Sequence, residues 1–129
     1  MKYLKYVACA VIAFLLFAGA ILWGVYNFLE NHAKASLATL TLAVNNQFDA
    51  NGNVRNPRHV MSVCESIDCD YSPDRVIPAC HPYADRSRQE CALAKERLRQ
   101  GLVKKFNVDF GDDWDQWWKH IDGVAPQEE

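Results

Sequence analysis

The sequence predicts an all-α protein: one N-terminal transmembrane helix followed by a small, disulfide-stapled bundle of about three to four helices. Three observations support this fold class. Residues 6–29 carry no charged side chain, and four cysteines lie beyond them. Apolar residues recur at helical spacing in the later segments, and none shows the sustained alternation of a half-buried strand.

Residues 6–29 form the predicted transmembrane anchor. At a helical rise of ~1.5 Å per residue they reach ~36 Å, which exceeds the ~30 Å hydrocarbon core of a bilayer. The alternative is a cleaved signal peptide, because Ala18-Gly19-Ala20 has the A-x-A pattern of a cleavage site. We favour an uncleaved signal-anchor, because apolar residues continue past that triplet to Leu29, beyond the usual ~7–15 residues.

The flanking charges predict the orientation of this helix. Lys2 and Lys5 precede it, and the first cation after it is Lys34. Because cations are retained on the cytoplasmic side, we expect a single-pass protein of the inner (cytoplasmic) membrane with a cytoplasmic N-terminus and a periplasmic or other extracytoplasmic C-terminal domain. Trp23 and Tyr26 are predicted to lie at the membrane interface, where aromatic rings favour the headgroup level.

The membrane helix is expected to continue from residue 30 to about residue 44. Leu37, Leu40 and Val44 recur along it at helical spacing. A polar loop follows, in which Asn51-Gly52 is a turn signal.

A second helix is predicted to start at Asn56-Pro57, because Asn is a strong N-cap and Pro suits the first helical position. One face of this helix is apolar and includes a cysteine: Val60, Val63, Cys64 and Ile67. The following segment, residues 69–83, contains three prolines and is predicted to be an ordered loop.

A third helix is expected from about residue 85 or 87 to Phe106. Ser87 and Glu90 have the spacing of a capping box at its start. Its apolar stripe again contains a cysteine and consists of Cys91, Ala94, Leu98, Leu102 and Phe106.

The last helix is predicted over residues 112–122, with Asp112 as its cap and Gly123 as its end. Its apolar face consists of Trp114, Trp117, Trp118 and Ile121. This face either completes the core or binds a partner, since Trp is enriched at interface hot spots. We carry these four residues forward as the candidate partner-binding site.

The four outer cysteines predict two disulfides, as expected for a small domain outside the cytoplasm. Two helices that each bury a cysteine favour Cys64–Cys91, which leaves Cys69–Cys80. The local pairing of Cys64 with Cys69 and Cys80 with Cys91 remains open. A zinc site that includes His81 is the functional alternative, but the spacings match no usual zinc pattern.

Charge is uneven although the net charge is only −2. Residues 84–106 carry seven cations and three anions, whereas residues 107–129 carry seven anions and one cation. We expect the acidic last helix to fold beside the basic one. An extracytoplasmic placement with an acidic neighbour argues against nucleic-acid binding. No motif predicts an enzyme, a catalytic residue, a cofactor, a metal ligand set or a small-molecule substrate.

Residues 101–120 resemble a known family. A helix followed by Asp109-Phe110-Gly111, an acidic pair, Trp114 and Trp117-Trp118 is similar to the closing segment of bacterial HEAT-type helical repeats. The chain has no second repeat and no ~40-residue period. The resemblance implies stacked helical hairpins and a scaffolding or binding role, with no catalytic residues.

The expected organisation is a cytoplasmic start (1–5), an anchor (6–29), a membrane-proximal helix and loop (30–55), a helical domain (56–123) and an acidic tail (124–129). Its partners are expected to be membrane lipid along 6–29 and proteins of the cell envelope. The predicted function is binding, as an accessory or assembly subunit of an envelope membrane complex. The alternative is a stand-alone inhibitor or immunity-type binder of a secreted toxin or hydrolase, and the third hypothesis is a metal- or thiol-active protein.

Overall fold

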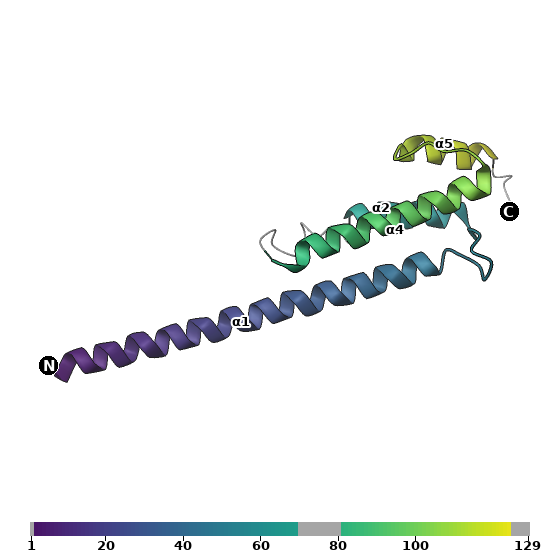
Figure 1. The fold of residues 1–129 in the computed structure, drawn as a ribbon. Coiled ribbons are helices and arrows are strands. Elements are labelled where there is room, and N and C mark those ends of the chain that lie inside the picture. Colours follow the sequence, from purple (N-terminus) through teal and green to yellow (C-terminus); the bar gives the residue numbers. More distant parts are fainter. Residues whose placement is uncertain (1, 70–80, 125–129) are drawn as a thin grey trace.

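A computed structural model describes residues 2–69 and 81–124 of the chain. Most of these residues lie in four helices (Figure 1): α1 (Lys2–Asn45), α2 (Pro57–Cys69), α4 (Tyr83–Phe106) and α5 (Trp114–Val124). Within these two ranges, the only strand-like pairing is an isolated antiparallel bridge between Phe48 and Val54. The all-α prediction is confirmed.

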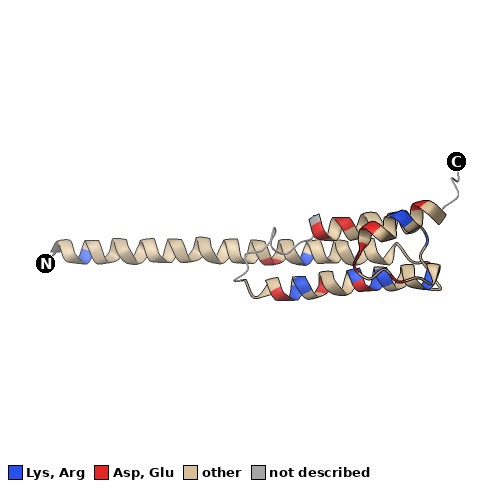
Figure 2. Ribbon diagram, turned by 90° about the horizontal axis from the view of Figure 1, so that it is seen from above, with Lys and Arg blue, Asp and Glu red and all other residues tan. Residues whose placement is uncertain are grey.

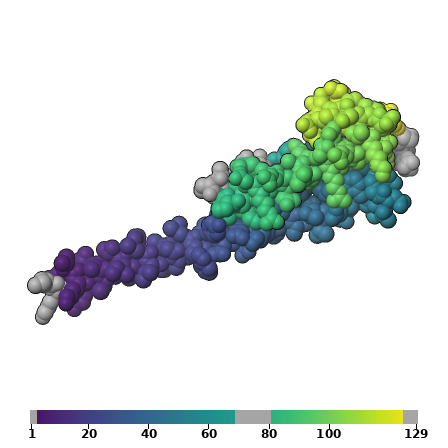
Figure 3. Space-filling view, viewed as in Figure 1, coloured from purple at the N-terminus to yellow at the C-terminus, as the bar shows by residue number. Residues whose placement is uncertain are grey.

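Helix α1 is one unbroken helix of 44 residues. Its first half projects alone from the rest of the molecule (Figure 3), and most of the described charged residues lie on the packed helices (Figure 2). It is long and apolar enough to cross a membrane, and the apolar segment is not buried by the protein. The predicted continuation beyond the apolar segment is confirmed, since the helix ends at Asn45.

The hydrophobic core lies between the second half of α1 and the other helices. Helix α4 runs in the same direction as α1, because Ala84 packs on Ala33 and Arg97 donates a hydrogen bond to Asn45 further along both helices. Helix α2 packs against α1, α4 and α5. The buried core includes Leu40, Val44, Val60, Met61, Cys64, Ile67, Leu98, Leu102, Trp117 and Ile121.

Two local predictions between α1 and α2 are confirmed. The Asn56 side-chain oxygen accepts the backbone N–H groups of Arg58 at 3.0 Å and His59 at 3.4 Å, so Asn56 caps α2. Gly52 has a φ of 74°, and its N–H donates to the Asp49 carbonyl at 3.0 Å. A positive φ is what Gly supplies to a tight turn at little steric cost.

The predicted start of the third outer helix is wrong. Helix α4 begins at Tyr83, and Ser87 is buried in its interior instead of capping it. The cap comes from His81, whose Nδ1 accepts the Tyr83 N–H at 3.1 Å and whose carbonyl accepts the Ala84 N–H at 2.9 Å. These bonds satisfy N–H groups that a helix start otherwise leaves without partners.

The predicted bounds of the last helix also need correction. Helix α5 begins at Trp114, Asp113 accepts the Gln116 N–H at 3.0 Å, and the helix continues through Gly123. Its backbone lies nearest α2, and its side chains also reach basic α4, where Phe106 meets His120 and Lys95 lies over the Trp114 ring. One ion pair across α2 and α5 joins Arg58 to Asp122 at 3.2 Å.

The cysteines on the two apolar faces are both buried, as predicted. Cys64 and Cys91 lie in the same core cluster, but no disulfide joins them. Burial raises the pKa of the Cys64 thiol to about 12. The Cys69 side chain and Cys80 lie outside the described residues. The disulfide staple is therefore not confirmed.

Candidate functional site

The apolar face of α5 divides into buried and accessible residues. Trp117 and Ile121 are 0% and 2% exposed and belong to the core, whereas Trp114 and Trp118 are partly exposed. The first pair therefore holds α5 in place and offers no surface to a partner. Of the candidate partner-binding residues, only Trp114 and Trp118 present aromatic surface.

Trp117 has partners for both its ring and its polar atom. Its Nε1–H donates to the Gly111 carbonyl at 3.1 Å. The Phe110 ring meets it edge-on, with centroids 5.0 Å apart, which is a favoured geometry for aromatic pairs. The indole N–H is therefore satisfied within the chain, as a buried polar group requires.

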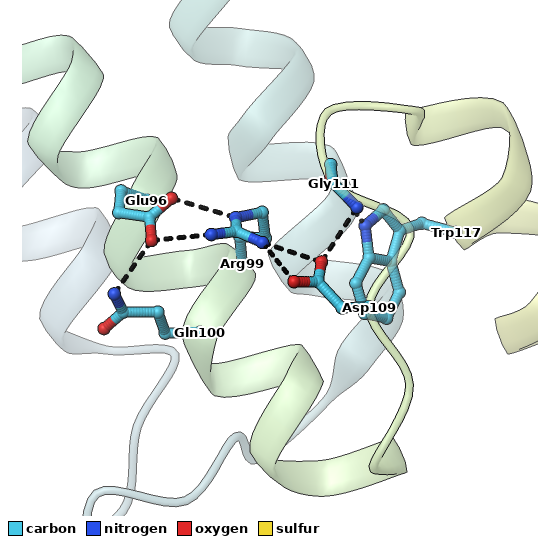
Figure 4. Close-up of polar contacts among 6 residues, drawn as sticks. All are labelled: Glu96, Arg99, Gln100, Asp109, Gly111 and Trp117. Atoms are coloured by element: carbon cyan, nitrogen blue, oxygen red, sulfur yellow. Dashed lines mark hydrogen bonds and ion pairs between the residues drawn. The ribbon is translucent and has the colours of Figure 1, made fainter.

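The loop that leads into α5 is fixed by Arg99 (Figure 4). Arg99 bonds both Glu96 oxygens at 2.8 and 2.9 Å and both Asp109 oxygens at 2.6 and 2.7 Å. Asp109 Oδ1 also accepts the Gly111 N–H at 2.8 Å. The hydrogen bonds from Arg99 lower the pKa of both carboxyl groups below their usual range. This network sets where α5 begins.

The two partly exposed indoles are joined to neighbouring helices. The Trp118 Nε1–H donates to Glu65 Oε1 at 2.7 Å. Lys95 lies 5.8 Å from the centroid of a Trp114 ring and binds Asp68 at 2.6 and 2.8 Å. Trp114 is thus positioned by a cation–π contact, and the cation is itself ion-paired.

An open depression of about 500 Å³ adjoins Trp114, between α4 and the loop before α5. We call it the Trp114 depression, and it is lined by Asp68, Ala92, Lys95, Glu96, Asp112 and Trp114. Its lysine is paired with Asp68, and Glu96 is paired with Arg99. An aromatic ring beside paired charges suits recognition of another surface, where aromatic residues are enriched.

The predicted membrane-interface residues lie on the projecting helix. Trp23 is 72% exposed, and Tyr26 stacks on His81 with ring centroids 4.3 Å apart. His81 is 7% exposed, and its Nε2 is buried without a hydrogen-bond partner in the described part of the chain. The sequence does not predict the stacking of Tyr26 on His81, because no local pattern relates these two distant residues.

The residues of the proposed metal or thiol site are only partly described. Cys64 lies in the main core, whereas His81 lies against α1 near Tyr26. Within residues 2–69 and 81–124, no group of three or more His, Cys, Asp or Glu side chains is arranged to hold a metal ion. The structure therefore does not bring Cys64 and His81 together as a ligand set.

Sequence reasoning also missed the polar partners of the Trp face. No contact of Glu65, Lys95 or Arg99 was predicted from the sequence. Each instead contacts α5 or the loop before it. The one available signal was that Lys95 and Arg99 are four residues apart and therefore share a helix face.

Comparison of the chain with protein-family models, curated proteins and solved structures finds no match. The resemblance of residues 101–120 to the closing segment of HEAT-type repeats therefore stays a prediction. In the structure these residues form the end of α4, the Arg99-bound loop and the first part of α5.

Proposed function

We propose that this chain is a membrane-anchored, extracytoplasmic binding protein that acts as an accessory or assembly subunit of a cell-envelope membrane complex. The observation that carries the proposal is the division of the α5 face. Trp117 is buried and anchors the helix, while Trp114 and Trp118 remain accessible beside it. Rigid, pre-positioned aromatic side chains lose little conformational entropy when a partner binds.

The anchor and its orientation belong to the same proposal. Helix α1 supplies a span of adequate length, and Lys2 and Lys5 precede its uncharged segment. The positive-inside rule then favours a cytoplasmic N-terminus in the inner membrane and a domain on the opposite side. A cysteine-accessibility or protease-protection assay on intact cells tests this orientation.

We also propose that the domain is oxidised in that compartment, with Cys64–Cys91 and Cys69–Cys80 as the pairing and the local pairing as its rival. Cys64 and Cys91 share one core cluster, which supports the first pairing. Each bridge forms from two thiols, with two protons and two electrons passed to a thiol oxidant of the envelope. Because the folded Cys64 thiol is buried, this bridge must form before the core closes. The mass of the unreduced protein, expected about 4 Da below that of the reduced one because two bridges remove four hydrogens, tests it.

The test of function is co-purification of the tagged full-length chain after extraction in a mild detergent. Trp114→Ala is expected to weaken the complex at least ~30-fold, as loss of a hot-spot residue does. Leu93→Ala is the matched control, because Leu93 is an exposed apolar residue on α4 that does not line the Trp114 depression. Equal retention of envelope proteins by the wild type, Trp114→Ala and Leu93→Ala would count against the proposal.

The alternative is a stand-alone inhibitor or immunity-type binder. One observation favours it: the described core uses only the second half of α1, so the membrane half contributes no buried core residue. An inhibitor should bind its target as a soluble fragment of residues 30–129, whereas a complex subunit should need its transmembrane helix. Comparing the two chains as pull-down baits distinguishes these functions.

A further inference from the structure

We propose that the membrane-facing end of α4 binds the headgroup of an anionic phospholipid. The binding groups are the side chains of Lys34 on α1 and Arg86 on α4, which lie about the ring of Tyr83. We call these three residues the headgroup site. The inference rests on the proposed membrane anchor but not on any protein partner.

The first step is the depth of this site. Figure 1 shows α4 beginning beside the middle of α1, and two contacts fix that position. His81 stacks on Tyr26 with ring centroids 4.3 Å apart, and Ala84 packs on Ala33, each 1% exposed. The start of α4 therefore lies beside the end of the uncharged segment at Leu29.

This position corresponds to the lipid headgroups. Ala33 is four residues past Leu29, or ~6 Å along the helix axis. The headgroup layer extends ~5–8 Å beyond the hydrocarbon core on each side. The first turn of α4 is therefore expected to face phosphate groups, and long Lys and Arg side chains can extend toward them.

The second step is the arrangement of cations. Lys34 Nζ lies 5.9 Å and the Arg86 guanidinium carbon 5.4 Å from the centroid of the Tyr83 ring. One ring thus positions two cations from two different helices. Figure 2 shows acidic and basic residues alternating at this end of α4, beside the charged residues of α1 that follow its uncharged half.

The third step is the charge that remains available. Glu30 pairs with Lys34 at 2.5 Å, and Asp85 pairs with Arg88 at 2.9 Å. The Lys34 ammonium has three N–H donors, so it can bind a phosphate oxygen while it stays paired with Glu30. Arg86 is exposed and forms no ion pair within the described ranges. The amino end of α4 adds a partial positive charge. The headgroup site therefore has a positive charge to offer. A lipid whose headgroup carries one phosphate and a net negative charge matches it better than a lipid with a zwitterionic headgroup.

The experiment uses the full-length chain in detergent micelles doped with equal amounts of phosphatidylglycerol and phosphatidylcholine. Native mass spectrometry counts the lipids that each protein molecule retains. The wild type is expected to retain phosphatidylglycerol preferentially. Arg86→Gln is expected to lower that preference about fivefold, because a basic residue near an anionic surface contributes ~1 kcal/mol. Lys34→Gln with Arg86→Gln is expected to lower it further.

The matched control is Lys104→Gln with Lys119→Gln, which removes two exposed cations from the end of α4 and from α5. This variant is expected to keep the wild-type preference. Equal losses in both double variants would overturn the proposal, because they would indicate attraction to the net charge alone. Circular dichroism checks that every variant keeps its helices, and Tyr83→Phe, which preserves the ring, is expected to keep the preference.

A competition arm separates a lipid from a free phosphate. Millimolar glycerol phosphate shares the chemistry of the headgroup but lacks the acyl chains. We expect it to leave the bound lipid in place, and displacement would overturn the lipid assignment. Co-purification of protein partners with the Arg86→Gln chain reports on the proposed function separately, so the two proposals can fail independently.

Discussion

The indole Nε1–H of Trp118 donates a 2.7 Å hydrogen bond to Oε1 of Glu65 and thereby joins α5 to α2. One turn earlier, Trp114 lies beside Lys95, which binds Asp68 near the end of α2. Both accessible indoles are therefore held by groups of their own chain. A surface ordered in advance pays less entropy on binding than one that must order with its partner.

Trp117→Ala should destabilise the fold strongly. The side chain is fully buried, and removing a buried aromatic ring typically costs ~3–5 kcal/mol. Denaturant unfolding of the detergent-solubilised chain, followed by circular dichroism, measures the change. Trp23→Ala is the matched control: its indole is 72% exposed on the projecting half of α1, and its loss should change the free energy of unfolding by less than ~0.5 kcal/mol. Similar effects for both substitutions would contradict the core role of Trp117.

The sequence could not separate Trp117 from Trp114. Both lie on one face of a helix at i and i+3, so periodicity predicts the same burial for both. Their difference arises from tertiary contacts: Trp117 meets Phe110 and the Gly111 carbonyl, whereas Trp114 lies at the edge near Lys95. Pattern therefore identifies the face but not which of its residues remain accessible.

The same distinction explains which helix starts were predicted. The cap of α2 is local, because Asn56 bonds residues two and three positions later, so the sequence shows it. The start of α4 depends on His81, whose ring packs on Tyr26 of a distant segment. Ser87 and Glu90 have the right spacing for a capping box, but that spacing cannot reveal a competing cap outside the pattern.

Gly101→Ala should destabilise the protein although Ala favours helices. A Cβ at Gly101 would lie 2.6 Å from Phe48 Cε1 and 2.8 Å from Val54 Cγ2. Ala gains up to ~1 kcal/mol in helix propensity, but overpacking typically costs ~1–3 kcal/mol. We expect a net loss in the free energy of unfolding. Gly123→Ala is the control: Gly123 lies in α5 with no neighbouring atom within 4 Å of the added Cβ, so this change should be neutral or stabilising.

The Arg99 network should make stability depend on pH in the acid range. Hydrogen bonds from Arg99 lower the pKa of Asp109 in the folded state. The stabilisation that ionised Asp109 adds to the folded state is therefore fully present above the ordinary Asp pKa of ~3.9. It is lost as the pH falls through the lower pKa that Asp109 has in the folded protein. Asp109→Asn should be less stable than the wild type at pH 7, and the difference should shrink as the pH falls below the ordinary Asp pKa of ~3.9 and the contribution disappears.

Thermal unfolding across this pH range checks the prediction. Asp115→Asn is a suitable control, because Asp115 is exposed and none of the ion pairs within the described ranges includes it. Its profile should run parallel to that of the wild type. A constant difference between the wild type and Asp109→Asn at every pH would show that the Arg99 contact does not depend on the charge of Asp109.

The reduced, folded protein should protect Cys64 from alkylation. The thiol is buried and its pKa is raised to about 12, so at pH 8 only about one molecule in 10⁴ carries the reactive thiolate. Mass spectrometry after a brief iodoacetamide pulse should find Cys64 unmodified in the native state and modified in denaturant. Unreduced protein should stay unmodified at Cys64 even in denaturant, because a disulfide survives unfolding whereas burial does not. Rapid labelling of unreduced Cys64 in denaturant would therefore refute the proposed staple while leaving the packing of the core intact.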